Sequence, residues 1–235
     1  MKIQTLFLLL LVIFLTSCQR SLTYSTSLNL PVEPMKKGGF EVQGSVEWFP
    51  ETVPEERNGE LMSAGLSGQV AFGLSDNVSL TLRGWMERDL SSQGLLVGVR
   101  LHKNLNQNYT IYGISRFGLL ANEFFFFGNS AYGSGNSIVI TRKIGKHSNI
   151  YVGTGLYSLY DFLLEWHPDK SYLGMMIISN IGFAINVNDD TRFNIECNPI
   201  FNMPNQYRGR QFLLAPSIGM AINLQDYKKK NEVDL

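Results

Sequence analysis

The sequence predicts an all-β protein, an antiparallel up-and-down β-barrel, with ten strands expected and eight as the alternative. Three observations predict this fold class. From residue 39 onward, apolar and polar residues alternate with a period of two. Short and long links between the alternating segments follow one another along the chain. Charged residues make up only 17% of the 235 residues, whereas a soluble domain carries roughly 25%.

The composition excludes several classes of function. Lys and Arg total 20 and Asp and Glu total 20, so the formal net charge is zero. This balance argues against a strongly basic nucleic-acid-binding protein, and no nucleic-acid partner is expected. Two cysteines, Cys18 and Cys197, are too few for a disulfide-rich scaffold. The sequence contains neither a phosphate-binding loop nor a dinucleotide-binding motif, so no cofactor is expected.

Residues 1–17 have the features of a signal peptide. Lys2 precedes an unbroken apolar run, Leu6 to Leu15, which is shorter than the ~20 residues that a transmembrane helix needs. The run ends in Leu15-Thr16-Ser17-Cys18, which has a leucine three places before a cysteine. This segment resembles the lipobox of bacterial lipoproteins, in which the cysteine is acylated and becomes the first residue of the mature protein.

The resemblance implies a lipid anchor at Cys18, because each buried CH₂ of an acyl chain adds ~0.8 kcal/mol of membrane affinity. Gln19 is not the aspartate that is linked in some bacteria to inner-membrane retention, so the family implies the outer membrane. Residues 18–38 then form a lipidated N-terminus and tether, and Cys197 is a free thiol. The alternative is an ordinary secretory signal that happens to contain a cysteine.

The predicted barrel occupies residues 39–225. Its first segment, Phe40 to Trp48, places apolar side chains on one face and Glu41, Gln43, Ser45 and Glu47 on the other. The same alternation recurs in residues 66–74, 78–87, 94–102, 150–157, 173–185, 192–198 and 214–224. Two further segments, at about 108–118 and 134–144, alternate less regularly. The sequence shows no helical stripe of comparable length.

The links indicate how the strands are arranged. Four are short, at residues 75–77, 103–108, 145–149 and 188–190. Five are long, at residues 49–62, 88–93, 119–131, 161–171 and 201–210. Antiparallel neighbours bring all short links to one end and all long links to the other, as in outer-membrane barrels. An even number of strands places both ends of the barrel chain at the short-link end.

The two predicted faces favour a transmembrane barrel over a soluble one. The apolar face carries almost no charge, and a charge facing lipid at mid-depth would cost ~2–4 kcal/mol. The other face is largely Gly, Ala and Ser with isolated charges, which we expect to form an ion-pair network inside the barrel. These charges are Glu41, Glu47, Arg83, Arg100, Arg116 and Glu196. A charge-selective pore is the alternative, although ten strands leave little lumen.

The mature chain therefore resembles small bacterial outer-membrane β-barrel proteins, and residues 72–82 resemble their usual strand–turn–strand unit. The resemblance implies a location in the bacterial outer membrane. The sequence departs from this family at its end, because it continues past Leu224 into a polar tail at residues 226–235 instead of ending on an aromatic residue.

Two long links carry unusual residues. Phe124–Phe127 is a run of four phenylalanines, which is either an insertion loop or an extension of a strand. Another link combines oxygen and nitrogen donors in Asp161, Glu165, His167 and Asp169. No second histidine stands at metal-ligand spacing and no established catalytic spacing is met, so we expect neither a metal site nor a catalytic site.

The sequence thus predicts an outer-membrane β-barrel lipoprotein with a structural or interaction role and no catalysis. It would present its long links as a scaffold or serve as an accessory subunit of a membrane complex. Its expected partners are outer-membrane lipid and other outer-membrane proteins. One alternative is a lipid-anchored soluble barrel that binds a hydrophobic ligand, and another is a hydrolase acting at the rim around His167.

Overall fold

The computed structural model describes residue 28 and residues 35–50, 62–87, 92–122, 130–161, 173–202 and 212–224. These residues contain ten strands: β1 (Phe40–Pro50), β2 (Met62–Ser75), β3 (Val78–Glu87), β4 (Ser92–Asn104), β5 (Tyr109–Asn122), β6 (Ser130–Ile144), β7 (Ser148–Asp161), β8 (Leu173–Asn186), β9 (Thr191–Asn202) and β10 (Phe212–Asn223). Within these ranges no helix is long and apolar enough to cross a membrane.

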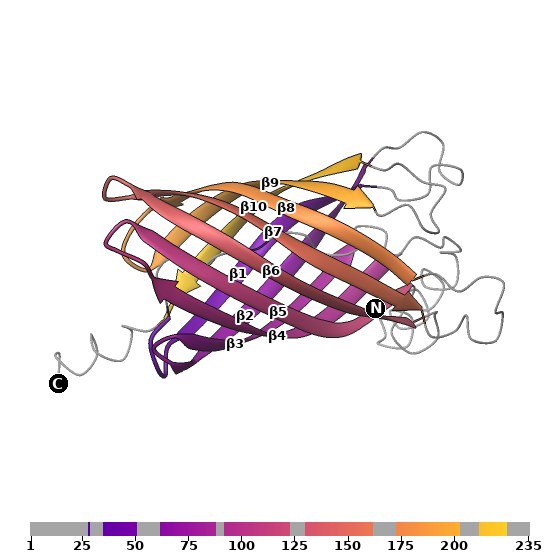
Figure 1. Cartoon of the computed structure of the whole chain (residues 1–235), viewed down its shortest axis with the longest axis horizontal. Coiled ribbons are helices and arrows are strands. Elements are labelled where there is room, and N and C mark those ends of the chain that lie inside the picture. The colour runs from indigo at the N-terminus through magenta and orange to yellow at the C-terminus, as the bar shows by residue number, and fades with distance from the viewer. Residues whose placement is uncertain are drawn as a thin grey trace, which may run out of the picture.

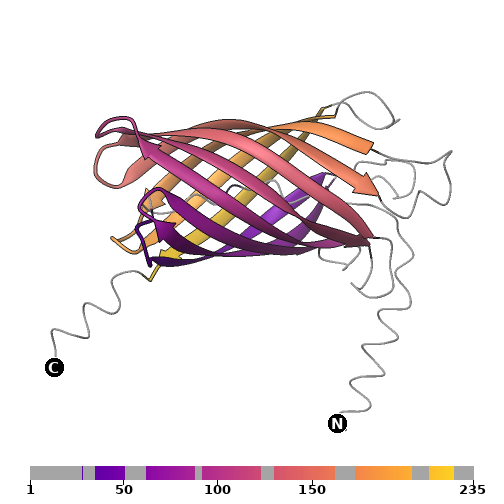
Figure 2. The same ribbon diagram turned by 60° about the horizontal axis from the view of Figure 1, so that its bottom comes forward.

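The strands form one closed antiparallel barrel in which each strand pairs with its sequence neighbours (Figure 1). β1 and β10 complete the closure, from Glu41 opposite Asn223 to Glu47 opposite Ser217. All strands are tilted relative to the long axis of the barrel, as closure requires (Figure 2). The predicted fold class is therefore confirmed, with ten strands rather than eight.

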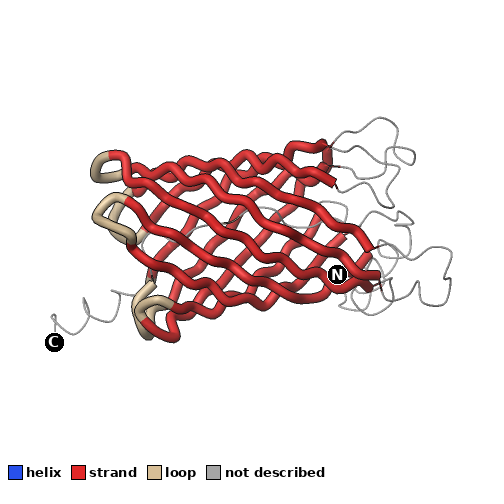
Figure 3. Tube along the Cα trace, in the orientation of Figure 1, coloured by secondary structure: helices blue, strands red, loops and turns tan. Residues whose placement is uncertain are grey.

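Four tight connections lie together at one end of the barrel, here called the short-turn end (Figure 3). They join β2 to β3, β4 to β5, β6 to β7 and β8 to β9. β1 begins and β10 ends at this same end, as predicted from the even number of strands. At the opposite end, here called the long-link end, the connections lie outside the described residues.

The alternation of side chains matches the prediction on both faces. Outward-facing Leu66, Ile138 and Val152 are 56–60% exposed, whereas inward-facing Arg83 and Arg100 are at most 2% exposed. The apolar faces therefore point away from the barrel, and the polar faces fill its interior. A soluble carrier needs the opposite arrangement, with an apolar interior and a polar exterior.

β5 and β6 extend further than predicted. Their pairing continues to Ala121 opposite Ser130, whereas the alternation predicted an end near residue 118 and a start near residue 134. Leu119 points outward and Leu120 is fully buried in the lumen, so both faces are apolar at this level. A strand that is apolar on both faces loses the period-two pattern, and its end cannot be read from alternation.

A filled lumen as the candidate functional site

Two buried ion pairs occupy the lumen beside β1. The Arg83 guanidinium of β3 pairs with the Glu47 carboxylate of β1, and Arg83 Nη2 also donates to Ser67 Oγ at 3.0 Å. Arg100 Nη2 of β4 donates to Glu41 Oε1 at 3.3 Å. Because all four charged side chains are at most 2% exposed, each charge depends on its partner. This confirms the predicted luminal ion pairing for these four residues.

A row of amides links the Glu41–Arg100 pair to the far wall of the barrel. Gln43 Nε2 donates to Glu41 Oε1 at 2.5 Å, and Gln69 Nε2 donates to Gln43 Oε1 at 3.0 Å. Arg116 Nη2 of β5 then donates to Gln69 Oε1 at 3.4 Å. The polar side chains of β1, β2 and β5 therefore form one connected network across the lumen, which fixes their rotamers.

Arg116 and Glu196, both predicted for this network, also hold a segment from outside the strands. The backbone N–H of Leu28 donates to Glu196 Oε2 at 2.9 Å, and Arg116 Nη2 donates to the Leu28 carbonyl at 3.2 Å. Glu196 accepts a further hydrogen bond from the Tyr151 hydroxyl at 2.7 Å. Leu28 is fully buried and belongs to a cluster with Tyr112, Ile114, Val139, Tyr151 and Ala184. Residues before β1 thus contribute to the interior of the barrel.

An apolar cluster occupies part of the lumen near the long-link end. Inward-facing side chains from seven strands form a second buried cluster there: Trp85, Leu96, Leu120, Tyr157, Met176, Ile178, Ile200, Leu213 and Ala215. Buried charges lie in this half as well, because Glu47 of β1 and Glu87, the last residue of β3, are at most 2% exposed. The apolar cluster was not predicted, because the inward face was interpreted as small residues with isolated charges.

The mouth of the barrel at the short-turn end is polar. It holds a hollow of about 720 Å³ bordered by Lys36, Asp76, His102, Thr110 and Lys143, among others. Nothing in its arrangement matches a nucleophile with a base, and the described residues contain no group of three metal-ligating His, Cys, Asp or Glu side chains. We therefore assign no reaction to this mouth.

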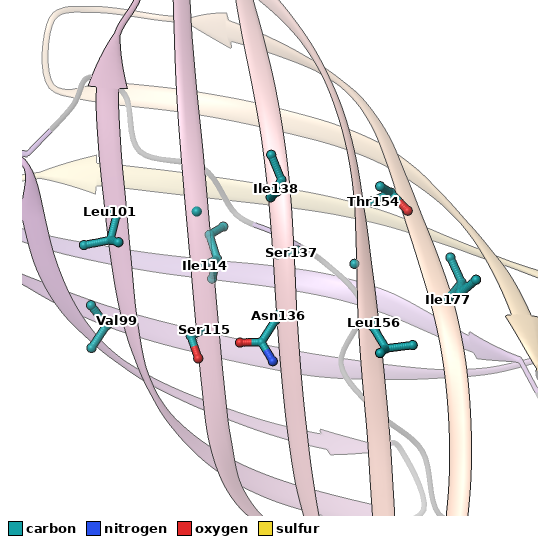
Figure 4. A pocket seen from close by; sticks show the side chains of 12 residues that line it. Val99, Leu101, Ile114, Ser115, Asn136, Ser137, Ile138, Thr154, Leu156 and Ile177 are labelled. Atoms are coloured by element: carbon teal, nitrogen blue, oxygen red, sulfur yellow. The ribbon is translucent and has the colours of Figure 1, made fainter.

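A shallow depression of about 570 Å³ lies on the outer wall over β4 to β8 (Figure 4). Ser115 and Asn136 face each other across β5 and β6, with Thr154 nearby on β7. Apolar residues such as Leu101 and Ile138 border these small and polar side chains. The depression is thus a polar spot on an otherwise apolar outer face.

Several predicted positions fall outside the described residues. Cys18, the run Phe124–Phe127, the tail 226–235 and the residues Glu165, His167 and Asp169 are among them. Asp161 closes β7, but its side chain is not described. The anchor at Cys18 therefore stays a prediction. Cys197 lies on the outer face of β9 as an exposed free cysteine.

Sequence reasoning missed the luminal role of Leu28. The segment around it contains Ser, Thr and Pro and was interpreted as a tether. The one available signal is that Leu22, Tyr24 and Leu28 are apolar at even positions within this polar segment. Further buried polar residues that were not assigned to the charged network include Glu87, Gln93 and Arg192.

No family model matches the sequence, and no curated protein matches it. Among solved structures, the chain is similar to the KdgM porin at 10% identity and a TM-score of 0.40, covering 77% of this chain and 98% of that one. It is similar to the NanC porin at 14% identity and a TM-score of 0.40, with coverages of 78% and 98%. It is also similar to the N-terminal β-barrel domain of Pseudomonas aeruginosa OprF at 14% identity and a TM-score of 0.35, with coverages of 80% and 98%.

At such low identities and TM-scores, these likenesses say nothing about what this chain binds or does, and the class of protein rests on the barrel itself. A closed antiparallel barrel with an apolar exterior and a charged, buried interior is a transmembrane β-barrel.

Proposed function

We propose that this chain is a bacterial outer-membrane lipoprotein whose barrel serves as a structural or interaction scaffold, and not as an open channel or an enzyme. The observation that carries the proposal is the filled lumen. Arg83–Glu47 and Arg100–Glu41 close it beside β1, and Leu28 lies between side chains from β5 and β9. Water-filled channels belong to barrels of ~16–18 strands, whereas the interior of this ten-strand barrel holds inward side chains and the main chain of Leu28.

The outer face supports the membrane location. Aromatic side chains lie outward near both ends of the strands: Phe40, Phe72 and Phe193 near the short-turn end, and Phe117, Tyr132, Phe201 and Phe212 near the long-link end. Two aromatic girdles that border an apolar band are typical of barrels spanning a bilayer. Most strands have 12–15 residues, which exceeds the ~9–11 that a tilted strand needs to cross hydrocarbon.

The lipoprotein part of the proposal rests on the lipobox-like sequence ending at Cys18. Palmitate incorporation in growing bacteria tests it. We expect the wild-type chain to be labelled and Cys18→Ser to lose the label. Cys197→Ser serves as the matched control and should keep it. A wild-type chain without label would show that the leader is an ordinary secretory signal.

Three measurements test the scaffold itself. The detergent-solubilised protein should migrate differently in electrophoresis with and without heating, as closed membrane barrels commonly do, and in planar bilayers it should give no steady conductance. A steady ohmic conductance would show that the barrel is a channel and not a scaffold.

A pull-down in mild detergent should recover another outer-membrane protein in a fixed ratio, because a scaffold without catalysis acts through partners.

A further inference from the structure

We propose that the segment preceding β1 is a strap held in the lumen, descending from the long-link end to the short-turn end. The amino terminus of the mature protein then lies on the long-link side of the membrane. The placement of its lipid on that side rests on the proposed acylation of Cys18, whereas the strap itself does not. The luminal site takes an extended peptide main chain, and its occupant is this chain's own segment around Leu28.

The direction of the strap follows from the turn that precedes β1. Gly39 N–H donates to the Lys36 carbonyl at 3.0 Å, and Gly38 has φ +76°, which is the pattern of a type II turn. The turn is fixed to the barrel by Gly38 N–H on the Gly73 carbonyl at 2.8 Å and by Gly73 N–H on the Gly39 carbonyl at 2.9 Å. Because this turn reverses the chain at the short-turn end, Met35, which directly precedes it, lies inside the barrel.

Two buried side chains show that the reversed chain lies inside the barrel. Met35, directly before the turn, is 2% exposed, and Leu28, seven residues earlier, is fully buried. Glu196 is the third inward-facing side chain of β9 counted from the short-turn end, after Arg192 and Asn194. Leu28 therefore lies several residues further from the short-turn end than the turn does. The chain that precedes Leu28 begins at this level of the lumen.

Arg116 and Glu196, which we call the luminal clamp, bind the main chain of Leu28 and not its side chain. They lie on β5 and β9, four places apart in the ten-strand circle and so on nearly opposite walls. The clamp satisfies both backbone polar groups of Leu28 with charged partners, and hydrogen bonds to charged groups are the stronger kind. A return of the chain toward the short-turn end would need a second passage through a lumen that inward side chains already fill.

The remaining distance fits the length of chain that is available. A tilted strand of 14 residues stands about 35 Å tall, so roughly 18 Å separates a mid-lumen residue from the long-link end. Ten positions separate Cys18 from Leu28, and ten extended residues span at most ~33–36 Å. Cys18 can therefore lie beyond the long-link end of the barrel.

Cysteine labelling of intact cells tests the side on which the strap ends. In the full-length Cys197→Ser background, single cysteines are introduced by Ser21→Cys in the strap, Asp189→Cys in a short turn and Ser92→Cys at the long-link end of β4. A bulky membrane-impermeant maleimide is applied before and after permeabilisation. We expect Ser21→Cys to follow Ser92→Cys and to differ from Asp189→Cys. If Ser21→Cys instead follows Asp189→Cys, the strap does not cross the lumen and the proposal is overturned.

Mapping of the labelled peptide separates this result from the question of the lipid. If Cys18 is not acylated, it reacts with the maleimide itself, on the same side as Ser21→Cys. The failure of the lipid assignment is thereby distinguished from the failure of the strap. Heat-modifiable migration confirms that each variant has folded.

The clamp has its own test, with Leu28→Cys as the reporter in folded protein. A small water-soluble maleimide should react slowly with it. Removal of the clamp donor by Arg116→Met should raise the rate about ten- to a hundredfold, as expected for loss of a hydrogen bond to a charged group. Arg142→Met is the matched control, because this exposed arginine lies over Tyr109 outside the lumen and should leave the rate unchanged. Fast labelling of Leu28→Cys with the clamp intact would overturn the proposal.

Discussion

Tyr151 of β7 lies against Gly182, its direct partner on β8, and from there donates its hydroxyl to Glu196 at 2.7 Å. A Cβ atom at residue 182 would come within 2.1 Å of the Tyr151 ring. The missing side chain of Gly182 therefore makes room for the ring. This ring and its hydrogen bond help to fix the carboxylate that binds the Leu28 backbone.

Substitution of Gly182 should weaken this part of the lumen. Gly182→Ala forces the Tyr151 ring to move, which strains the packing and lengthens its bond to Glu196, so we expect a loss of about 1–3 kcal/mol in the free energy of unfolding. Gly113→Ala is the matched control, since a Cβ there meets nothing within 4 Å, and its effect should stay within ~0.5 kcal/mol. Urea unfolding of the protein in lipid vesicles measures both. Equal effects would show that Tyr151 does not depend on the glycine.

The contributions of Glu41 and Arg100 to the free energy of unfolding should be coupled. Removal of one partner leaves a buried charge, so Glu41→Leu or Arg100→Met should each cost about 3–5 kcal/mol of unfolding free energy. The double variant removes both charges and should cost clearly less than the sum of the two single changes. The same unfolding assay gives the coupling energy. Additive effects would mean that the two charges do not stabilise each other.

The sequence sufficed to predict the faces of the strands, because a period of two places Phe40 and Glu41 on opposite faces and the near absence of charge on the apolar face indicates that it points outward. It also predicted the short-turn end. It did not predict which charges pair, since Arg83 reaches Glu47 across the intervening β2, and that reach depends on register and tilt. The position of Leu28 was missed because the space that its side chain fills exists only once the barrel is closed. The segment itself offers only one weak signal, the apolar residues Leu22, Tyr24 and Leu28 at even positions.

Cys197 offers a probe of the outer face. Its thiol is exposed on β9 between outward-facing apolar neighbours, so in a bilayer it should face hydrocarbon. A charged water-soluble thiol reagent does not enter hydrocarbon, so it should not modify Cys197 in vesicles. Denaturation should expose it. Asp189→Cys, placed in a short turn, is the positive control, and mass spectrometry of the modified peptide locates the label. Modification of Cys197 at the rate of Asp189→Cys would place this face in water.

A charge placed on the apolar belt tests the membrane assignment by its depth dependence. Val152 is 56% exposed on the outer face of β7, within the belt, so Val152→Arg should cost about 2–4 kcal/mol in lipid vesicles. Val187 is similarly exposed at 60%, but it lies in a short turn beyond the strands, so Val187→Arg should cost only ~0–1 kcal/mol. The two substitutions change the same side chain in the same way and differ only in depth. In a barrel surrounded by water, both would be nearly neutral, so equal small costs would contradict a lipid-facing exterior.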